Sequence, residues 1–568
     1  MKVAQAVGTA LARLGAGTVF GVVGSGNFHV TNALIAGGAR FVAARHEGGA
    51  ATMADAYARA SGGLGVLSVH QGPGLTNALT GITEAAKSRT PLLVLTGEVA
   101  AGAVRSNFRV DQAALARAVG AVPERIHSPA TALADLARAC RTAVAERRTV
   151  VLGLPLDVQE AEYTGPERVD RPAPYGAGRP GRPVFGPGGP GQVPFLPVPP
   201  PAAVARLADA LAAAERPVFI AGRGARLSGA AEPLRALAER CGALLATSAV
   251  ARGLFLGDPY DLDVSGGFGT PAATELIAGA DLLVGWGSSL NMWTLRHGSL
   301  VGKGTTVVQV DLDSAALGAH RTVDLSLIGD VAETARAAEA ELAGRGHAAP
   351  GYRSPAVAGR LARERRWRDV PYDDDSDGSR IDPRTLSIAL DDLLPAERTV
   401  AVDSGNFMGY PAMYLGVPDA DGLVFTQAFQ SVGLGLATAI GAAVARPDRL
   451  TVAALGDGGA LMAAGELETA VRLGLGLLVV VYDDEAYGAE VHHFGPDGHP
   501  LDTVTFPPAD LAAIGQGFGC RSVTVRKRED LGPVAEWLAG PRDRPMLVDA
   551  KVTGNVPSWW LEEAFRGH

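Results

Sequence analysis

Short apolar runs alternate with longer stretches of mixed polarity over most of the chain. In residues 1–164 the apolar runs include TVFGVV, GVLSV and PLLVLTG, and alanine-rich amphipathic stretches separate them. Such runs are typical of strands that are buried on both faces of a parallel sheet, and the stretches between them have the period of covering helices. The pattern therefore predicts an α/β domain in this part of the chain.

The same alternation occurs in two further blocks. Residues 202–345 contain RPVFIAGRG and DLLVGWGSS, and residues 382–568 contain RTVAVDSG, RLTVAALGDGG and LGLLVVVYDD. The blocks are separated by residues 165–201, which are rich in proline and glycine, and by residues 346–381, which are charged, and we interpret both segments as linkers. The sequence thus predicts three consecutive doubly wound parallel-sheet domains of the α/β class.

Length, composition and charge limit the number of domains and the classes of partner that we expect. A chain of 568 residues is too long for a single hydrophobic core. The net charge is −9 and Lys and Arg do not cluster, which argues against a nucleic acid partner. No apolar run reaches the roughly 18 residues of a membrane span, so a membrane is not expected either. The three cysteines, Cys140, Cys241 and Cys520, are far apart without metal-ligand spacing, which favours the reducing cytoplasm.

Candidate chemistry lies in the third block, at the ends of two strands. The strand LTVAALG ends in GDGG, residues 456–459, where glycines let backbone amides approach a phosphate. The next strand, LLVVVY, ends in DDEAYG, residues 483–488. Because neighbouring parallel strand ends meet at one crevice, Asp457 and Asp484 can supply oxygen ligands to one hard cation such as Mg²⁺. The spacing predicts a cation that clamps a diphosphate, although GDG alone is also typical of an ordinary turn.

GDGG and DDEAYG, 27 residues apart from Asp457 to Asp484, together resemble the thiamine diphosphate motif of the family that includes acetolactate synthase, pyruvate decarboxylase and benzoylformate decarboxylase. The resemblance spans nearly the whole chain and implies pyrimidine-binding, central and diphosphate-binding domains in that order. It implies that Asp457 and Asp484 ligate the metal through their side chains and Ala486 through its carbonyl oxygen. It also implies cofactor contacts at Gly405, Asn406, Ser431, Val432, Gly456, Gly458, Gly459 and Tyr487.

Further expectations concern Val432, Asp483 and Asp484. Val432 takes the place of the bulky apolar residue that holds the cofactor bent in relatives, and an ordinary core valine is the alternative. Relatives usually have Asn where this chain has Asp483 and Asp484. The additional negative charge would bind the cation more strongly but would repel the diphosphate.

A carboxyl group in the first block completes the resemblance. Glu47, in RHEGGA, lies between the strand RFVAA and a helix, where an acidic residue is also favourable simply as part of the first helical turn. The resemblance implies that Glu47 is the acid that activates the aminopyrimidine of the cofactor. Because relatives place this glutamate and the metal site on different subunits, it also implies a homodimer or a dimer of dimers with interfacial active sites.

Three further residues are candidates for steering the reaction. The loop GPGLTN after His70 resembles that of acetolactate synthase, whereas a histidine at this position resembles benzoylformate decarboxylase and can shuttle protons near neutral pH. Glu490 matches an acidic proton donor of pyruvate decarboxylases, with a solvated helix residue as the alternative. Gln112 lies where acetolactate synthases carry pocket residues.

We therefore predict an enzyme that depends on thiamine diphosphate and Mg²⁺, decarboxylates a 2-oxo acid and transfers the remaining fragment to an acceptor. The alternative is a decarboxylase that releases an aldehyde. A cofactor-binding subunit without activity would not need Glu47, and a nucleotide-dependent oxidoreductase lacks the G-x-G-x-x-G fingerprint. In the middle block, residues 222–224 and 285–289 could face a nucleotide, but the arginine-rich segment of flavin-binding relatives is missing after GWGSS, so FAD is possible and not favoured.

Overall fold

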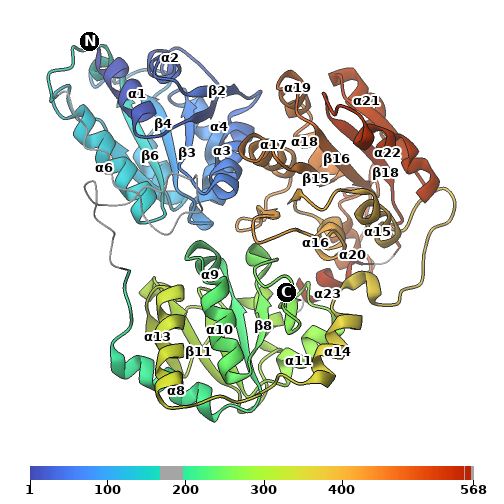
Figure 1. Cartoon of the computed structure of the whole chain (residues 1–568). Helices are drawn as coiled ribbons and strands as arrows, with labels where there is room; N and C mark the ends of the chain where they lie inside the picture. Colours follow the sequence, from blue (N-terminus) through green and yellow to red (C-terminus); the bar gives the residue numbers. More distant parts are fainter. Residues whose placement is uncertain (167–195, 556, 565–568) are drawn as a thin grey trace.

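The computed structural model describes residues 1–166, 196–555 and 557–564. These residues form three six-stranded sheets with helices packed around them, and all strand pairs are parallel. The prediction of three consecutive doubly wound α/β domains is confirmed. Figure 1 shows the N-terminal domain (blue) beside the C-terminal domain (orange to red), with the central domain (green to yellow) below both.

The N-terminal domain contains β1 (Thr18–Gly21), β2 (Arg40–Ala43), β3 (Gly65–Val69), β4 (Leu92–Glu98), β5 (Val122–Arg125) and β6 (Thr149–Pro155). Their order in the sheet is β2-β1-β3-β4-β6-β5. Its helices are α1 (Val3–Arg13), α2 (Phe28–Ala36), α3 (Glu47–Ser61), α4 (Pro73–Lys87), α5 (Gln112–Ala118), α6 (Ala132–Ala145) and α7 (Leu156–Glu160). Strands β3, β4 and β6 are almost wholly buried, as expected of inner strands that are covered on both faces.

The central domain contains β7 (Pro217–Ala221), β8 (Leu244–Thr247), β9 (Asp261–Val264), β10 (Leu282–Trp286), β11 (Thr306–Asp311) and β12 (Leu325–Ile328), in the order β12-β11-β10-β7-β8-β9. Its helices are α8 (Pro201–Ala213), α9 (Arg223–Leu227), α10 (Ala231–Cys241), α11 (Pro271–Ala278), α12 (Met292–Leu295) and α13 (Val331–Gly344). A Cβ atom at Gly224 would lie 2.7 Å from the Cα of Gly287, so glycine is required there for the two loops to pass each other.

The C-terminal domain contains β13 (Arg398–Val402), β14 (Leu423–Phe425), β15 (Leu450–Gly456), β16 (Leu477–Asp483), β17 (Arg521–Val525) and β18 (Met546–Lys551), in the order β14-β13-β15-β16-β18-β17. Its helices are α15 (Pro383–Leu393), α16 (Gly409–Tyr414), α17 (Gly435–Ala445), α18 (Asp457–Met462), α19 (Glu466–Arg472), α20 (Gly488–Phe494), α21 (Leu511–Phe518), α22 (Gly532–Ala539) and α23 (Trp559–Ala564). The ends of β15 and β16 are therefore neighbours, as the motif spacing requires.

The two predicted linkers differ in what the structure shows of them. Most of the segment 165–201 lies outside the described residues. The charged segment 346–381 contains a helix, α14 (Pro355–Glu364). Arg360 of α14 pairs with Glu275 of α11 at 2.7 Å, so this connector packs on the central domain.

One hydrophobic core joins the N- and C-terminal domains. Helices α3 and α17 pack together, and their buried residues belong to the same cluster as those of both sheets. A Cβ atom on Gly441 of α17 would collide with the backbone carbonyl of Met53, so small residues set the close approach of the two helices. This contact fixes the start of α3, and with it Glu47, relative to the C-terminal domain of the same chain.

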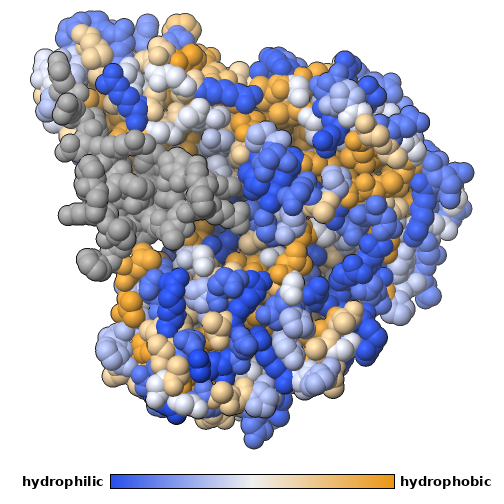
Figure 2. Space-filling model, in the orientation of Figure 1, coloured by the Kyte–Doolittle hydropathy of each residue, from blue (hydrophilic) through white to orange (hydrophobic). Residues whose placement is uncertain are grey.

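Figure 2 shows how hydrophobic and hydrophilic residues are distributed over one face of the molecule. On the face shown in Figure 2, hydrophilic residues are spread over all three domains, and hydrophobic ones gather mainly over the N- and C-terminal domains. Within the described ranges, no helix combines the length and the apolar character needed to cross a bilayer.

Candidate functional site

A cavity of about 490 Å³ opens at the carboxyl ends of β13, β15 and β16. This is the edge of a parallel sheet at which ligands bind. Most residues predicted to contact a cofactor or metal line the cavity, as does Glu490: Gly405, Asn406, Val432, Gly456, Asp457, Gly458, Gly459, Asp484, Ala486, Tyr487 and Glu490. Ser431 does not line it, and its hydroxyl lies 3.3 Å from the carbonyl oxygen of Val432.

Two carboxylates, one buried and one half-buried, line this cavity. Asp457 is the first residue of α18, directly after β15, and Asp484 follows β16. Burial raises the pKa of Asp457 to about 7, and the charges of Asp484 and Asp483 add to the shift. Burial also raises the pKa of Asp484 to about 7. A divalent cation between them would relieve this cost, because buried charges are stable only when paired or bound to metal.

The turns around these carboxylates require glycine. A Cβ atom at Gly458 would lie 2.7 Å from the Cε1 atom of Tyr487, and one at Gly488 would lie 2.5 Å from Oδ2 of Asp484. A Cβ atom at Gly459 would collide with the buried carboxylate of Asp403. Glycine thus lets these turns pack closely, and all three glycines also line the cavity, where backbone beside the acidic pair suits a diphosphate with its cation.

The protein would supply few ligands to a metal in this cavity. No three His, Cys, Asp or Glu side chains among the described residues converge on a position that could hold a metal. Two carboxylates and the carbonyl oxygen of Ala486 fit a cation that also takes ligands from phosphate oxygens and water, as Mg²⁺ commonly does. The residues thus fit both the metal and the diphosphate predicted from the sequence.

Asp403 positions one wall of the cavity. It is buried at the end of β13 and accepts hydrogen bonds from the backbone amides of Ser404 at 2.8 Å, Gly433 at 3.0 Å and Leu434 at 3.2 Å. Burial raises its pKa to about 6, while these amides act in the opposite direction. The contacts hold the segment that presents Val432 to the cavity. The Val432 side chain is 37% exposed, so it is not an ordinary core valine in this chain.

Sequence reasoning missed two tryptophans that line the same cavity. Trp293 comes from α12 of the central domain and Trp560 from the C-terminal helix α23, and their ring centres are 6.2 Å apart. The indole nitrogen of Trp560 donates to the carbonyl oxygen of Asn406 at 3.1 Å. In the sequence, Trp560 belongs to the apolar run SWWL, residues 558–561, and this run does not indicate which residues Trp560 contacts.

Glu47 lies at the start of α3, outside the cavity that contains Asp457. It is the half-buried first residue of α3, and its Oε2 accepts a hydrogen bond from the side chain of Asn77 at 3.1 Å. Glu466 of α19 accepts the backbone amides of Arg45 at 3.1 Å and His46 at 3.0 Å, which fixes the turn before Glu47. Glu47 does not line the cavity that contains Asp457.

His70 lies beside Glu47. A Cβ atom at Gly74 would lie 3.1 Å from the Cβ of His70 and 3.6 Å from Oε1 of Glu47, so both side chains border the same glycine. The Nδ1 atom of His70 lies 2.7 Å from the carbonyl oxygen of Gln71 and must donate to it, because a carbonyl only accepts. Nε2 then lacks the proton in the neutral ring, and the hydroxyl of Ser25 lies 3.3 Å away.

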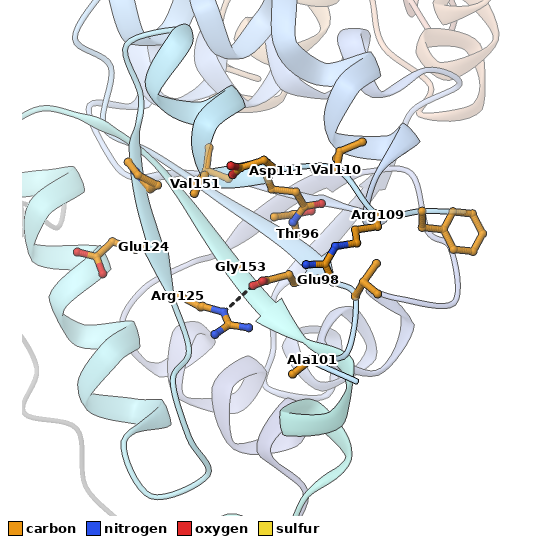
Figure 3. A pocket seen from close by; sticks show the side chains of 15 residues that line it. Thr96, Glu98, Ala101, Arg109, Val110, Asp111, Glu124, Arg125, Val151 and Gly153 are labelled. Atoms are coloured by element: carbon orange, nitrogen blue, oxygen red, sulfur yellow. Dashed lines mark hydrogen bonds and ion pairs between the residues drawn. The ribbon is translucent and has the colours of Figure 1, made fainter. Parts of the chain in front are cut away.

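Gln112 borders a second cavity. Its Oε1 accepts the amide of Gly72 and its Nε2 donates to the carbonyl of Gly97, both at 3.0 Å. The side chain therefore ties the loop after His70 to the end of β4. The cavity has a volume of about 630 Å³ and lies in the N-terminal domain, where Arg125 pairs with Glu98 at 2.8 Å (Figure 3). The structure does not bring Gln112 to the cavity of Asp457.

Comparison with known families assigns all three domains. The model for the N-terminal TPP binding domain of thiamine pyrophosphate enzymes matches residues 1–116, that for the central domain matches residues 204–338, and that for the C-terminal TPP binding domain matches residues 403–550. The chain belongs to the thiamine pyrophosphate enzyme family. Thiamine pyrophosphate is the same compound as thiamine diphosphate, so the predicted cofactor is confirmed.

Relatives along nearly the whole chain carry out different reactions. The chain is 29% identical to an acetolactate synthase large subunit of Parasynechococcus marenigrum, covering 97% of this chain and 87% of the relative. It is 32% identical to a protein named as a probable 2-ketoarginine decarboxylase of Pseudomonas aeruginosa, covering 93% and 89%. It is 28% identical to a sulfoacetaldehyde acetyltransferase of Alcaligenes xylosoxydans, covering 92% and 88%. The chain is thus a thiamine diphosphate-dependent enzyme.

Proposed function

We propose that this enzyme requires Mg²⁺, decarboxylates a 2-oxo acid and transfers the remaining acyl fragment to a carbonyl acceptor, in the manner of acetolactate synthases. The observation that carries the cofactor requirement is the pair of carboxylates, buried Asp457 and half-buried Asp484, at adjacent strand ends beside the glycine turn. The choice of a ligation reaction is supported by relatives named as acetolactate synthase and acetyltransferase.

The C-terminal domain would hold the cofactor. Asp457, Asp484 and the carbonyl oxygen of Ala486 would ligate Mg²⁺, and the backbone at Gly458 and Gly459 would face the diphosphate. When bound, thiamine diphosphate supplies a thiazolium carbon that attacks the 2-oxo group and stabilises the charge left by the loss of carbon dioxide. The protein contributes binding, orientation and proton transfer.

Glu47 would act from a second copy of the chain. Within one chain, Glu47 does not line the cavity of Asp457, and its carboxylate accepts a hydrogen bond from Asn77 of the N-terminal domain. Large apolar side chains are exposed near the cavity, with Val432 37% and Met462 60% exposed, which supports contact with another protein surface. We therefore propose a homodimer, or a dimer of dimers, in which Glu47 of one chain hydrogen-bonds to the cofactor held by Asp457 of the other.

His70 and Glu490 would control proton delivery. His70 borders Glu47, and its Nε2 lies 3.3 Å from the hydroxyl of Ser25, while Glu490 lines the cavity of Asp457. In the proposed dimer the two residues approach the reacting centre from opposite chains. A proton donated before an acceptor arrives would release an aldehyde, whereas withheld protonation would favour ligation.

The second candidate function is a decarboxylase that releases an aldehyde. His70 favours it, because imidazole with a fixed tautomer is suited to proton transfer near neutral pH. The relative named as a 2-ketoarginine decarboxylase also supports this candidate. FAD is not part of either proposal, because the close packing of Gly224 against Gly287 accounts for the central glycines without a nucleotide.

The experiment is a product analysis on the purified full-length enzyme. It is incubated with thiamine diphosphate, Mg²⁺ and a panel of 2-oxo acids, with and without aldehyde or 2-oxo acid acceptors, and products are identified by mass spectrometry and NMR. Hydroxyketone or hydroxy-oxo acid products that require both cofactor and Mg²⁺ are expected. Aldehyde as the sole product with every acceptor would establish the second candidate, and turnover that persists in EDTA would contradict the Mg²⁺ requirement. Flavin absorbance of the same preparation tests for FAD.

A further inference from the structure

We propose that Lys551 is a positioning residue for the cofactor site, because it holds and neutralises Asp483 so that only Asp484 of this acidic pair faces the cation. The inference rests on the proposed Mg²⁺ and diphosphate site. It explains how this chain can carry an aspartate where relatives usually have an amide.

Lys551 and Asp483 face each other across two neighbouring strands. They occupy paired positions at the ends of β18 and β16, and both are buried, with 5% and 1% of their surface exposed. The Nζ atom of Lys551 donates to Oδ2 of Asp483 and, at 2.9 Å, to the carbonyl oxygen of Ala509. It also lies 3.2 Å from Oδ2 of Asp549, two residues earlier on the same strand. Asp483 therefore points into the protein beneath the cavity.

The direction of Asp483 matters because its charge is felt at both metal ligands. Its negative charge contributes to the raised pKa values of Asp457 and Asp484. A carboxylate at residue 483 that was free to turn would place a third negative charge beside the diphosphate, in a region where charges are poorly screened. Lys551 prevents this, since Asp483 does not line the cavity.

The acidic residue on the other side of Asp484 is held in the same way. Glu485 pairs with Arg380 at 2.6 Å, and Arg380 also donates to the backbone carbonyl of Val552 at 3.0 Å. Glu485 has a φ of 59°, so the chain reverses direction there and carries Ala486 back to the cavity. Each acidic neighbour of Asp484 thus has a basic partner, and Asp484 is the one that lines the cavity.

A buried ion pair can also be an ordinary part of a core, and the two roles differ in one respect. If Lys551 serves only packing, its replacement by an apolar residue of similar length should act alike whatever stands at residue 483. If it serves to restrain the charge of Asp483, the loss should disappear when residue 483 carries an amide. Replacing Asp483 by Asn restores the residue type that relatives usually have at this position.

The test is a double-mutant cycle on the full-length protein. All variants carry Asp549→Asn, so that Lys551 retains a single carboxylate partner. Affinity for thiamine diphosphate at saturating Mg²⁺ is measured by calorimetry for the background, for added Lys551→Met, for added Asp483→Asn, and for both together. The thermal unfolding midpoint of each variant is recorded. Lys303→Met, at an exposed position of the central domain, serves as the control for loss of a lysine.

We expect Lys551→Met to weaken affinity for thiamine diphosphate at saturating Mg²⁺ by about tenfold or more, because the unpaired charge of Asp483 repels the diphosphate, and the added Asp483→Asn to restore it to within about threefold of the background. Unchanged affinity in Lys551→Met would overturn the inference, and so would equal losses with and without Asp483→Asn. Failure of the background and the parent alike to bind Mg²⁺ with thiamine diphosphate would instead contradict the proposed function.

Discussion

The functional residues at the carboxyl edges of the N- and C-terminal sheets are held in opposite ways. In the C-terminal domain, Asp457 is buried and Asp484 is half-buried, and burial raises both pKa values to about 7. In the N-terminal domain, Glu47, His70 and Gln112 each make hydrogen bonds to nearby protein groups. Two sheets of similar architecture thus present different edges, one with carboxylates whose charged forms are disfavoured and one with side chains that are already hydrogen-bonded.

This difference indicates a separate function for each edge. Burial disfavours the charged forms of Asp457 and Asp484, and a bound cation would relieve this cost, so we expect the C-terminal edge to bind the cofactor. At the N-terminal edge, Glu47 and His70 line neither of the two cavities described above, so they are suited to act on a molecule that is bound elsewhere. Loss of binding and loss of turnover should therefore separate cleanly between the two edges.

The largest effect is expected at the metal ligand. Asp457→Ala should weaken Mg²⁺-dependent binding of thiamine diphosphate by more than about a hundredfold, because one of two carboxylate ligands is lost. Calorimetric titration with and without EDTA measures it. Asp484→Asn is the matched control, since an amide oxygen is also a hard ligand and binding should persist. Parental affinity in Asp457→Ala would remove this residue from the site.

The next largest effect is expected at Glu47, and on turnover alone. Glu47→Gln keeps the shape of the side chain but cannot exchange the proton, so the rate should fall by roughly a hundredfold while cofactor affinity stays close to the parental value. Turnover and calorimetry on the same preparation separate the two quantities. Unaltered turnover would reduce Glu47 to a residue that merely starts α3.

Mixing inactive subunits sharpens the comparison between the edges. If each active site combines Glu47 of one chain with Asp457 of the other, random exchange between Glu47→Gln and Asp457→Ala chains should recover about a quarter of the parental sites. Mixtures prepared by refolding or coexpression are assayed against each variant alone. Absence of recovered activity in verified mixed dimers would place both residues in one chain's site.

A smaller, qualitative effect is expected in the product ratio. His70→Ala and Glu490→Gln should each remove a proton donor and so raise the ratio of ligation product to aldehyde by several-fold. The ratio is measured at fixed concentrations of 2-oxo acid and acceptor. If both variants slow the two products equally, His70 has only its role in the loop and Glu490 only that of a helix residue at the cavity wall.

The last effect is expected at Asp403 and concerns the free energy of unfolding, with no change in catalysis implied. Its raised pKa means that the folded state holds this proton up to about pH 6, whereas the unfolded chain loses it near pH 4. Its contribution to stability is therefore greatest below pH 4 and falls as the pH rises to 6. The stability difference between the parent and Asp403→Asn should change by an amount on the order of 2 kcal/mol between pH 4 and pH 7, measured by denaturant unfolding. A constant difference would contradict the raised pKa.

The sequence by itself determined the three sheets and the two turns that carry Asp457 and Asp484. Inner parallel strands such as LLVVVY are apolar along their whole length, and that pattern is local. The positions of Asp457 and Asp484 followed from it, because strand ends at one edge of a parallel sheet lie together whatever the rest of the chain does. Glu47 at the start of α3 was predictable for the same reason.

Tertiary structure alone decided how those residues are supported. Lys551 meets Asp483 across 68 residues of sequence, Glu466 reaches the turn before Glu47 from the other end of the chain, and Trp560 meets Asn406. None of these contacts has a local signature, because a side chain's partner depends on which strands and helices pack side by side. The separation of Glu47 from the cavity of Asp457 has the same origin, since the contact between α3 and α17 sets the relative position of the two domains. Periodicity reports only which face of an element is buried, and packing selects what it is buried against.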